Sequence, residues 1–329
     1  MMHHRSSLEA ASKPANSKTR QVIMGENDVA IQMVAILGTM LAIIGGLITI
    51  QTPEKSVGSY LPSSSTQPSK RAYEQFVLAY TPIWMFSFVC IVAFGWYETF
   101  DEWSYLRVCI GLAMPFLLQP IVLPSAGCDS PDAKRPLFER YSFKANLWIL
   151  VYSFIGNYWY THYFYSVLKA KYTMPAHRLN NVPIALYFAT HFYFSSYHAF
   201  SNLMLRKVVT SYQKGFLRSL LFVSVVLCFS YFTAFMETLT ISAYPDYSFE
   251  DQDMAYTVGS AFYGIYFIVS FPAFFLFDDE VDAEKNNAAA RKVTLYDSFL
   301  SSCGHGMMIM ILLDFVRLYL DIPLVVGKL

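Results

Sequence analysis

Long apolar segments alternate with short polar ones along the chain. Eight apolar segments contain about 20 residues, the length that an α-helix needs to cross the hydrocarbon core of a bilayer. They are residues 29–50, 76–96, 105–123, 147–168, 182–205, 216–242, 255–277 and 299–319. The pattern predicts an all-α protein, a polytopic transmembrane helix bundle of about eight spans.

The first 72 residues divide differently from the rest. Residues 1–28 are polar and rich in Ser and basic groups, so we expect a disordered tail. The apolar run at 29–50 is too long, and lies too far from the first residue, for a typical cleavable signal peptide. It predicts a transmembrane helix. Residues 51–72 contain many Ser, Pro and Lys residues and are expected to form a flexible linker.

The composition supports a membrane protein. Of the 329 residues, 55% are hydrophobic, 17% are aromatic and 15% are charged, whereas soluble domains contain about 25% charged residues. Lys and Arg together number 24, as do Asp and Glu. This balance leaves no basic excess for nucleic-acid binding. The five cysteines are scattered, without the spacing of a zinc site or a disulfide framework.

Two of the apolar segments, 147–168 and 182–205, carry polar groups at bilayer depth. These are Asn157, His162, His191, His198 and Asn202. A polar or ionisable group in this position costs a few kcal/mol unless it faces the bundle interior or a wet cavity. The two segments are therefore the first candidates for a functional site. The alternative is that these groups join helices by hydrogen bonds.

Helical spacing places several polar residues on common faces. In the segment 182–205, four polar residues follow one another at intervals of four, three and four: His191, Ser195, His198 and Asn202. Glu237, in the segment 216–242, has no cationic residue within one turn. Because apolar surroundings disfavour a charged carboxylate, Glu237 is a candidate proton donor. A partner on another helix is the alternative.

Aromatic residues extend from the segment ends well into the spans, beyond the interfacial belts that are usual in membrane proteins. Tyr160, Tyr263 and Tyr266 are examples. Such density suits a large, rigid, apolar ligand, and aromatic faces can stabilise a cation.

In the last segment, Asp314 and Arg317 are three residues apart and are expected to neutralise each other.

Several long stretches of the chain resemble one enzyme family. They include SKRAYEQFVLAYTPIWM, RYSFKANLWILVYSFIGNYWYTHYFYSVL, YTMPAHRLNNVP, ATHFYFSSYHAFSNLMLR, FSYFTAFMETLTISAYPDYSFED and VGSAFYGIYFIVSFPAFFLFDDE. In order, from Ser69 to Glu280, they are similar to the cycloeucalenol cycloisomerases, also called cyclopropylsterol isomerases. The resemblance does not cover residues 1–68. It implies a seven-span isomerase core at 73–329 and an additional N-terminal helix at 29–50.

The resemblance implies an activity without a cofactor. Enzymes of this family open the 9β,19-cyclopropane ring of cycloeucalenol, giving obtusifoliol in sterol biosynthesis. A proton is added to the strained ring, positive charge develops at carbon 9, and loss of the proton on carbon 8 forms the double bond. The implied partners are the sterol and the lipid bilayer, and the implied location is the endoplasmic reticulum membrane, as a multi-pass protein.

This chemistry suggests roles for the polar residues inside the spans. We assign the acid to Glu237 and the base to His191 or His198, and the reverse assignment is also open. Candidate substrate-binding residues are Asn157, Tyr160, His162, Ser195, Asn202, Tyr263 and Tyr266. Two other functions remain as alternatives: another sterol isomerase of the Δ8–Δ7 type, and a non-catalytic sterol-binding membrane protein.

Overall fold

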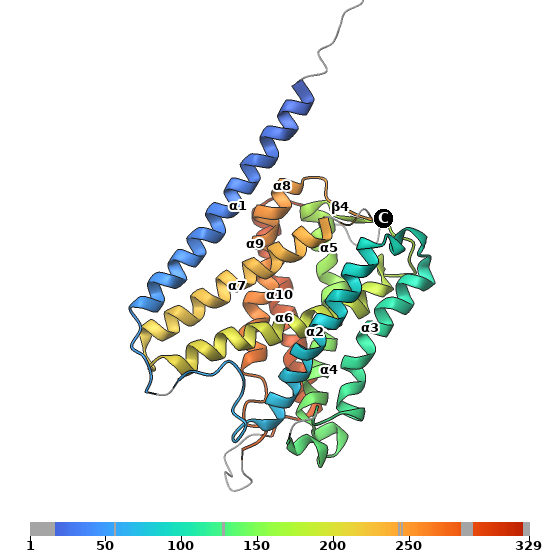
Figure 1. Ribbon diagram of the computed structural model, residues 1–329. Helices are drawn as coiled ribbons and strands as arrows, with labels where there is room; N and C mark the ends of the chain where they lie inside the picture. Colours follow the sequence, from blue (N-terminus) through green and yellow to red (C-terminus); the bar gives the residue numbers. More distant parts are fainter. Residues whose placement is uncertain are drawn as a thin grey trace, which may run out of the picture.

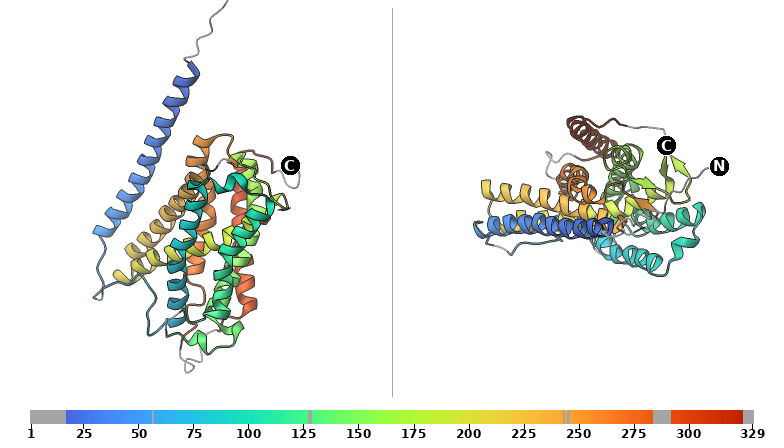
Figure 2. Two further views of the ribbon diagram at one scale, coloured as in Figure 1. Left: turned by 45° about the vertical axis from the view of Figure 1, so that its right-hand side comes forward. Right: turned by 90° about the horizontal axis from the view of Figure 1, so that it is seen from above.

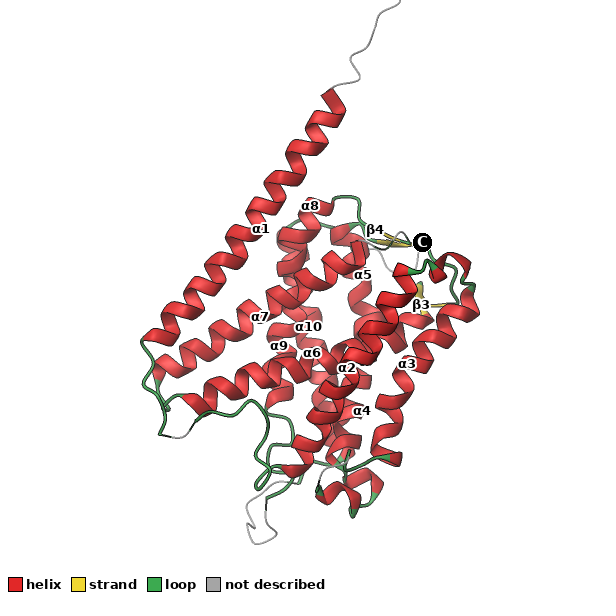
Figure 3. Cartoon of the chain, viewed as in Figure 1, coloured by secondary structure: helices red, strands yellow, loops and turns green. Residues whose placement is uncertain are grey.

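A computed structural model describes residues 17–55, 57–126, 129–242, 244, 246–283 and 292–324, with side chains from Val29 onward. Eight long helices account for most of this part of the chain, as Figure 3 shows. They are α1 (Ser17–Thr49), α2 (Pro68–Ala93), α3 (Glu102–Val122), α4 (Tyr141–Ile155), α6 (Ile184–Ser211), α7 (Phe216–Ser242), α9 (Ser260–Phe275) and α10 (Leu295–Tyr319). The predicted all-α helix bundle is confirmed.

Within the described residues, six helical segments are long and apolar enough to cross a membrane. They contain α1, α2, α3, α7, α9 and α10. The other two long helices, α4 and α6, belong to the segments in which the sequence places its buried polar groups. The prediction of about eight spans therefore agrees with the number of long helices, and six of them meet the criterion of length and apolarity.

The first helix lies along the outside of the bundle (Figures 1 and 2). It begins at Ser17, within the segment expected to be a polar tail, and packs mainly on α7. Val29 and Met33 contact Tyr231 and Phe235 there. Most of its other apolar side chains are exposed, including Val34 at 73%. An apolar helix exposed in this way suits a lipid environment.

Aromatic side chains fill the centre of the bundle. The pairs α7–α9, α4–α10 and α3–α6 pack most extensively. Between them lie the fully buried residues Trp148, Tyr152, Phe192, Phe267, Phe271 and Phe274. Much of the aromatic density in the sequence therefore forms a rigid core, because rings bury a large area and pack edge to face.

In the described part of the chain, three π-helical turns interrupt the helices. After α4 the chain continues through η4 (Gly156–Tyr160), α5 (Thr161–Tyr163) and η5 (Phe164–Leu168), and η6 (Ala255–Gly259) joins α8 (Gln252–Met254) to α9. A β-carbon at Gly259 would lie only 2.7 Å from Leu168 Cδ2, so η5 and η6 approach closely here and a larger residue would require the Leu168 side chain to shift. Such turns often occur at functional sites.

Two short antiparallel ribbons lie near one end of the bundle. In the first, β2 (Arg178–Leu179) pairs with β3 (Val182–Pro183), and Asn180 and Asn181 form the turn, both with positive φ. Asn tolerates this conformation in two-residue hairpin turns. The polar link HRLNNVP is therefore explained by its turn. In the second ribbon, β1 (Lys171–Tyr172) pairs with β4 (Tyr247–Ser248).

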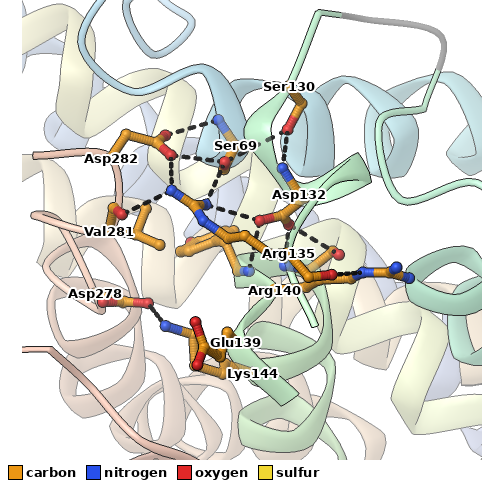
Figure 4. A network of polar contacts seen from close by, with 12 residues as sticks. Ser69, Ser130, Asp132, Arg135, Glu139, Arg140, Lys144, Asp278, Val281 and Asp282 are labelled. Carbon is orange, nitrogen blue, oxygen red and sulfur yellow. Dashed lines mark hydrogen bonds and ion pairs between the residues drawn. The ribbon is translucent and has the colours of Figure 1, made fainter. Parts of the chain in front are cut away.

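Ion pairs join the helices at the opposite end (Figure 4). Arg135 donates to Asp132 at 2.9 Å and to Asp282 at 2.8 Å, and Lys144 forms an ion pair with Asp278. The short helices η2 (Pro131–Ala133) and η3 (Leu137–Glu139) carry part of this network. A further short helix outside the network, η1 (Trp96–Thr99), precedes α3. Burial raises the pKa of Asp278, and the neighbouring Lys144 partly offsets this effect. These contacts hold the α3–α4 and α9–α10 connections together.

Candidate active site

The carboxyl group of Glu237 lies between three helices. Tyr263 on α9 donates its phenol hydrogen to Glu237 Oε2 at 2.7 Å, and Tyr197 on α6 also interacts with this carboxyl group. None of the ion pairs found between described residues involves Glu237. The partners that the sequence left open are thus tyrosines, which hold the carboxyl group in position without neutralising a charge.

Glu237 faces a small cavity between α6, α7, α9 and the π-helical turn η4. The cavity has a volume of about 50 Å³. This is room for one or two water molecules, each of which takes up about 30 Å³ in the liquid. Its polar side chains are Asn157, Thr161, Tyr172, Thr190, Glu237, Thr238, Tyr247, Tyr263 and Tyr266. Of the predicted site residues, Asn157, Glu237, Tyr263 and Tyr266 are therefore brought together.

Asn157, in η4, is held by two hydrogen bonds. Its Nδ2 donates to the Ser153 carbonyl at 2.9 Å and to Thr190 Oγ1 at 2.6 Å. Thr190 in turn donates to the Leu186 carbonyl at 2.9 Å. Asn157 is 4% exposed and lines the cavity. The π turn therefore places an amide in the same cavity lining as the carboxyl group of Glu237.

The ribbon β1–β4 forms the outer wall of the cavity. Tyr172 and Tyr247 are paired across the ribbon, with ring centroids 4.6 Å apart, and both line the cavity. Burial raises the pKa of both phenols, so both keep their protons. This wall is built from short strands, whereas the other walls belong to packed helices.

His198 and His191 lie outside the cavity lining. His198 Nδ1 is 2.7 Å from the Phe194 carbonyl, which can only accept, so Nδ1 carries the proton. His198 Nε2 then accepts from Ser270 Oγ at 2.9 Å. His191 Nε2 lies 3.2 Å from Asn146 Oδ1. Both rings are thus buried between helices and bonded within the bundle.

The remaining stripe residues of α6 also bond to other groups. Ser195 donates to the His191 carbonyl at 2.7 Å. Asn202 donates to Glu74 Oε1 at 2.8 Å, and Arg206 forms an ion pair of 2.7 Å with the same carboxylate. The end of the stripe therefore belongs to a buried ion pair that joins α2 to α6.

Tyr160 and His162 do not line the cavity, although both follow closely after Asn157 in the chain. The Tyr160 hydroxyl donates to the Gly306 carbonyl at 3.0 Å, and its ring packs on Tyr266 with centroids 4.6 Å apart. His162 is fully buried against Trp159 and Tyr165. Neither of its ring nitrogens has a hydrogen-bond partner in the described part of the chain.

Sequence reasoning assigned no site residue to the face of α6 that contributes to the cavity, although it noted the aromatic residues there. Thr190 and Phe194 line the cavity, and Tyr197 interacts with Glu237. These three residues follow at intervals of four and three, which is helical spacing. This face lies one position before the polar stripe that begins at His191. It is harder to recognise in the sequence because it combines one hydroxyl group with two aromatic rings and so does not form a polar stripe. Thr161, Thr238, Tyr172 and Tyr247 were missed as well.

The described residues contain no group of three or more His, Cys, Asp or Glu side chains that could hold a metal ion.

The chain is 39% identical over 278 residues to a curated protein, cycloeucalenol cycloisomerase of Arabidopsis thaliana. The matched region covers 82% of this chain and 95% of that protein. No protein-family model and no solved structure matches the chain.

Proposed function

The chain belongs to the cycloeucalenol cycloisomerase family of isomerases, and on this premise we propose that it opens the 9β,19-cyclopropane ring of cycloeucalenol to give obtusifoliol. The observation that carries the proposal is the carboxyl group of Glu237, held by Tyr263 at a cavity inside a helix bundle of membrane type. An isomerisation needs one proton added and one removed, with no change in oxidation state.

Glu237 is the acid in this proposal. Its proton goes to carbon 19 as the bond between carbons 9 and 19 breaks, and the electron deficiency then lies at carbon 9. Positioned acid–base catalysis contributes about 10²–10⁴-fold to a rate. The rings of Tyr263 and Tyr266 line the cavity and can stabilise the developing cation through their faces.

The base must take the proton from carbon 8. Carbon 8 is bonded directly to carbon 9, so the carboxylate left on Glu237 after the first step is near enough to accept this proton. We therefore propose that Glu237 serves both steps. His191 and His198, the bases expected from the sequence, do not line the cavity, and they remain the alternative that a variant can test.

The cavity must widen to admit a sterol. Pockets for ligands of this size have volumes of about 300 Å³ or more, whereas this cavity has about 50 Å³. The wall formed by β1 and β4 contains two residues in each strand. We propose that this ribbon moves to let the sterol enter from the bilayer, and that the protein works in the endoplasmic reticulum membrane.

Conversion of cycloeucalenol by microsomes that contain this chain tests the proposal. The sterols are extracted and separated by gas chromatography–mass spectrometry. We expect obtusifoliol to form without an added cofactor. If cycloeucalenol is unchanged while the protein is folded and inserted, the activity is wrong. Conversion of a Δ8 sterol to its Δ7 isomer, in a parallel incubation without cycloeucalenol, would instead support the other sterol isomerase.

A further inference from the structure

The amide of Asn157 can adopt only one orientation. The Ser153 carbonyl can only accept a hydrogen bond, so it must face Nδ2 of Asn157 and not Oδ1. The second Nδ2 hydrogen goes to Thr190 Oγ1. Thr190 gives its own hydrogen to the Leu186 carbonyl, which leaves its oxygen free to accept. Thr190 and the Ser153 carbonyl therefore hold Nδ2 of Asn157 together, which leaves Oδ1 as the end of the amide that is free to bind a ligand.

Two polar atoms at the cavity are left without partners. None of the described residues donates to Asn157 Oδ1, because both hydrogen bonds of this side chain use Nδ2. The Tyr266 hydroxyl is buried and also lacks a partner within the described residues. Both residues line the cavity. A buried polar group without a partner is costly, so the Tyr266 hydroxyl indicates a missing polar ligand group, and Asn157 Oδ1 is an unused acceptor in the same cavity lining.

A hydroxyl group fits these two atoms. It has one hydrogen to donate, which suits Asn157 Oδ1, and an oxygen that can accept from the Tyr266 hydroxyl. We propose that Asn157 and Tyr266 bind the ring-A hydroxyl of the sterol, and that Thr190 is the positioning residue for Asn157. This inference rests on the proposed function, since it names the part of the substrate that this site recognises.

The position of Glu237 agrees with this assignment. In the sterol skeleton the hydroxyl-bearing carbon and the cyclopropane lie at opposite sides of a single ring. Asn157 and Glu237 line the same small cavity. A sterol anchored by its hydroxyl at Asn157 would therefore present its cyclopropane within one ring of the anchor, toward the carboxyl group. The anchor would set the register of the reacting carbon.

Equilibrium binding tests the inference separately from catalysis. The purified full-length chain in detergent is incubated with radiolabelled obtusifoliol, the proposed product, which keeps the ring-A hydroxyl and is not turned over. The label is displaced by unlabelled obtusifoliol or by its 3-deoxy analogue. Removing the hydroxyl makes the sterol more apolar, so a site without hydrogen-bond partners would bind the analogue at least equally well. We expect the analogue to bind about 10-fold more weakly to the wild-type protein.

Variants assign this preference to Thr190. We expect Thr190→Val to reduce the ratio of the two affinities to near one, and Thr190→Ser, which keeps the hydroxyl, to retain it. Thr39→Val is the matched control, because Thr39 makes the same type of bond to its own helix on exposed α1. Melting temperatures show whether each variant is folded.

The outcomes separate the two proposals. A wild-type protein that does not distinguish the two sterols overturns the hydroxyl site, whatever its activity. A hydroxyl preference that survives in folded Thr190→Val overturns the role of Thr190. A protein that prefers the hydroxylated sterol, loses this preference in Thr190→Val and converts no cycloeucalenol keeps the binding site and overturns the proposed reaction.

Discussion

Tyr263 on α9 donates a hydrogen bond of 2.7 Å to Oε2 of Glu237 on α7. The two helices pack along their lengths, so the bond joins a candidate acid to a rigid support. Because a phenol supplies one donor and no net charge, it orients the carboxyl group without forming an ion pair. Orientation of this kind is what proton transfer to a poorly basic carbon requires.

Replacing Glu237 with Gln tests the acid directly. Glutamine keeps an oxygen that can accept from Tyr263 but has no acidic proton. We expect kcat to fall about 10²–10⁴-fold with little change in melting temperature. The assay is conversion of cycloeucalenol by purified protein. Glu98→Gln, at an exposed carboxyl group in η1, is the control. Activity of the Gln variant at the wild-type rate would remove Glu237 from the mechanism.

Deuterium at carbon 8 of the substrate tests whether one carboxyl group serves both steps. If Glu237 takes the proton from carbon 8, it holds that proton when the next sterol binds. We expect mass spectrometry to find some deuterium on carbon 19 of obtusifoliol formed in ordinary water. Transfer is favoured because the cavity has room for only one or two water molecules. Complete loss of the label to solvent would argue for a separate base.

His198 is expected to affect stability more than chemistry. Its two ring nitrogens bond to the Phe194 carbonyl and to Ser270 in the fully buried core. Replacement by Ala leaves a cavity and unpaired groups, so we expect a loss of about 2–5 kcal/mol in the free energy of unfolding. Denaturant unfolding in detergent measures it. Activity per folded molecule should stay within about threefold of wild type. A stable but inactive variant would restore His198 as the base.

The helices could largely be predicted because a membrane span has a simple apolar signal. Residues 216–242 were predicted as a span, and α7 has these bounds. The last span was predicted to end at residue 319, where α10 ends. The π turns were not predicted, because a π turn differs from an α turn by one residue of register and leaves the apolar pattern unchanged.

The site could be predicted only in part, because its contacts come from distant parts of the chain. Glu237 was recognisable as a carboxyl group without a cation nearby in sequence. Its bond to Tyr263 depends on how α7 packs against α9. Similarly, the stripe at His191 is a true helical face, but the packing of α6 directs the neighbouring face with Thr190 toward the cavity. The spacing of residues in a sequence shows which residues share a helix face, but it does not show which other helix that face packs against.

The Lys144–Asp278 pair, shown in Figure 4, lies outside the cavity lining and is expected to be a strong structural contact. Each side chain is only 2% exposed. Lys144→Met would leave a buried carboxylate without its cation, and we expect a loss of about 3–5 kcal/mol in the free energy of unfolding. The double variant Lys144→Met/Asp278→Leu should recover most of this loss. A double-mutant cycle with no coupling between the two positions would contradict the expectation.

A disulfide across the ribbon tests whether β1 and β4 separate during turnover. Lys171 and Ser248 are paired in register, and both are exposed. Paired positions in antiparallel strands have Cα atoms about 4.5–5.5 Å apart, a separation that a disulfide can span. We expect Lys171→Cys/Ser248→Cys to lose at least about 90% of its activity on oxidation and to regain it on reduction, because the closed cavity is smaller than a sterol. Each single Cys variant, treated identically, should stay active. Full activity of the oxidised double variant would show that β1 and β4 need not separate for the sterol to reach Glu237.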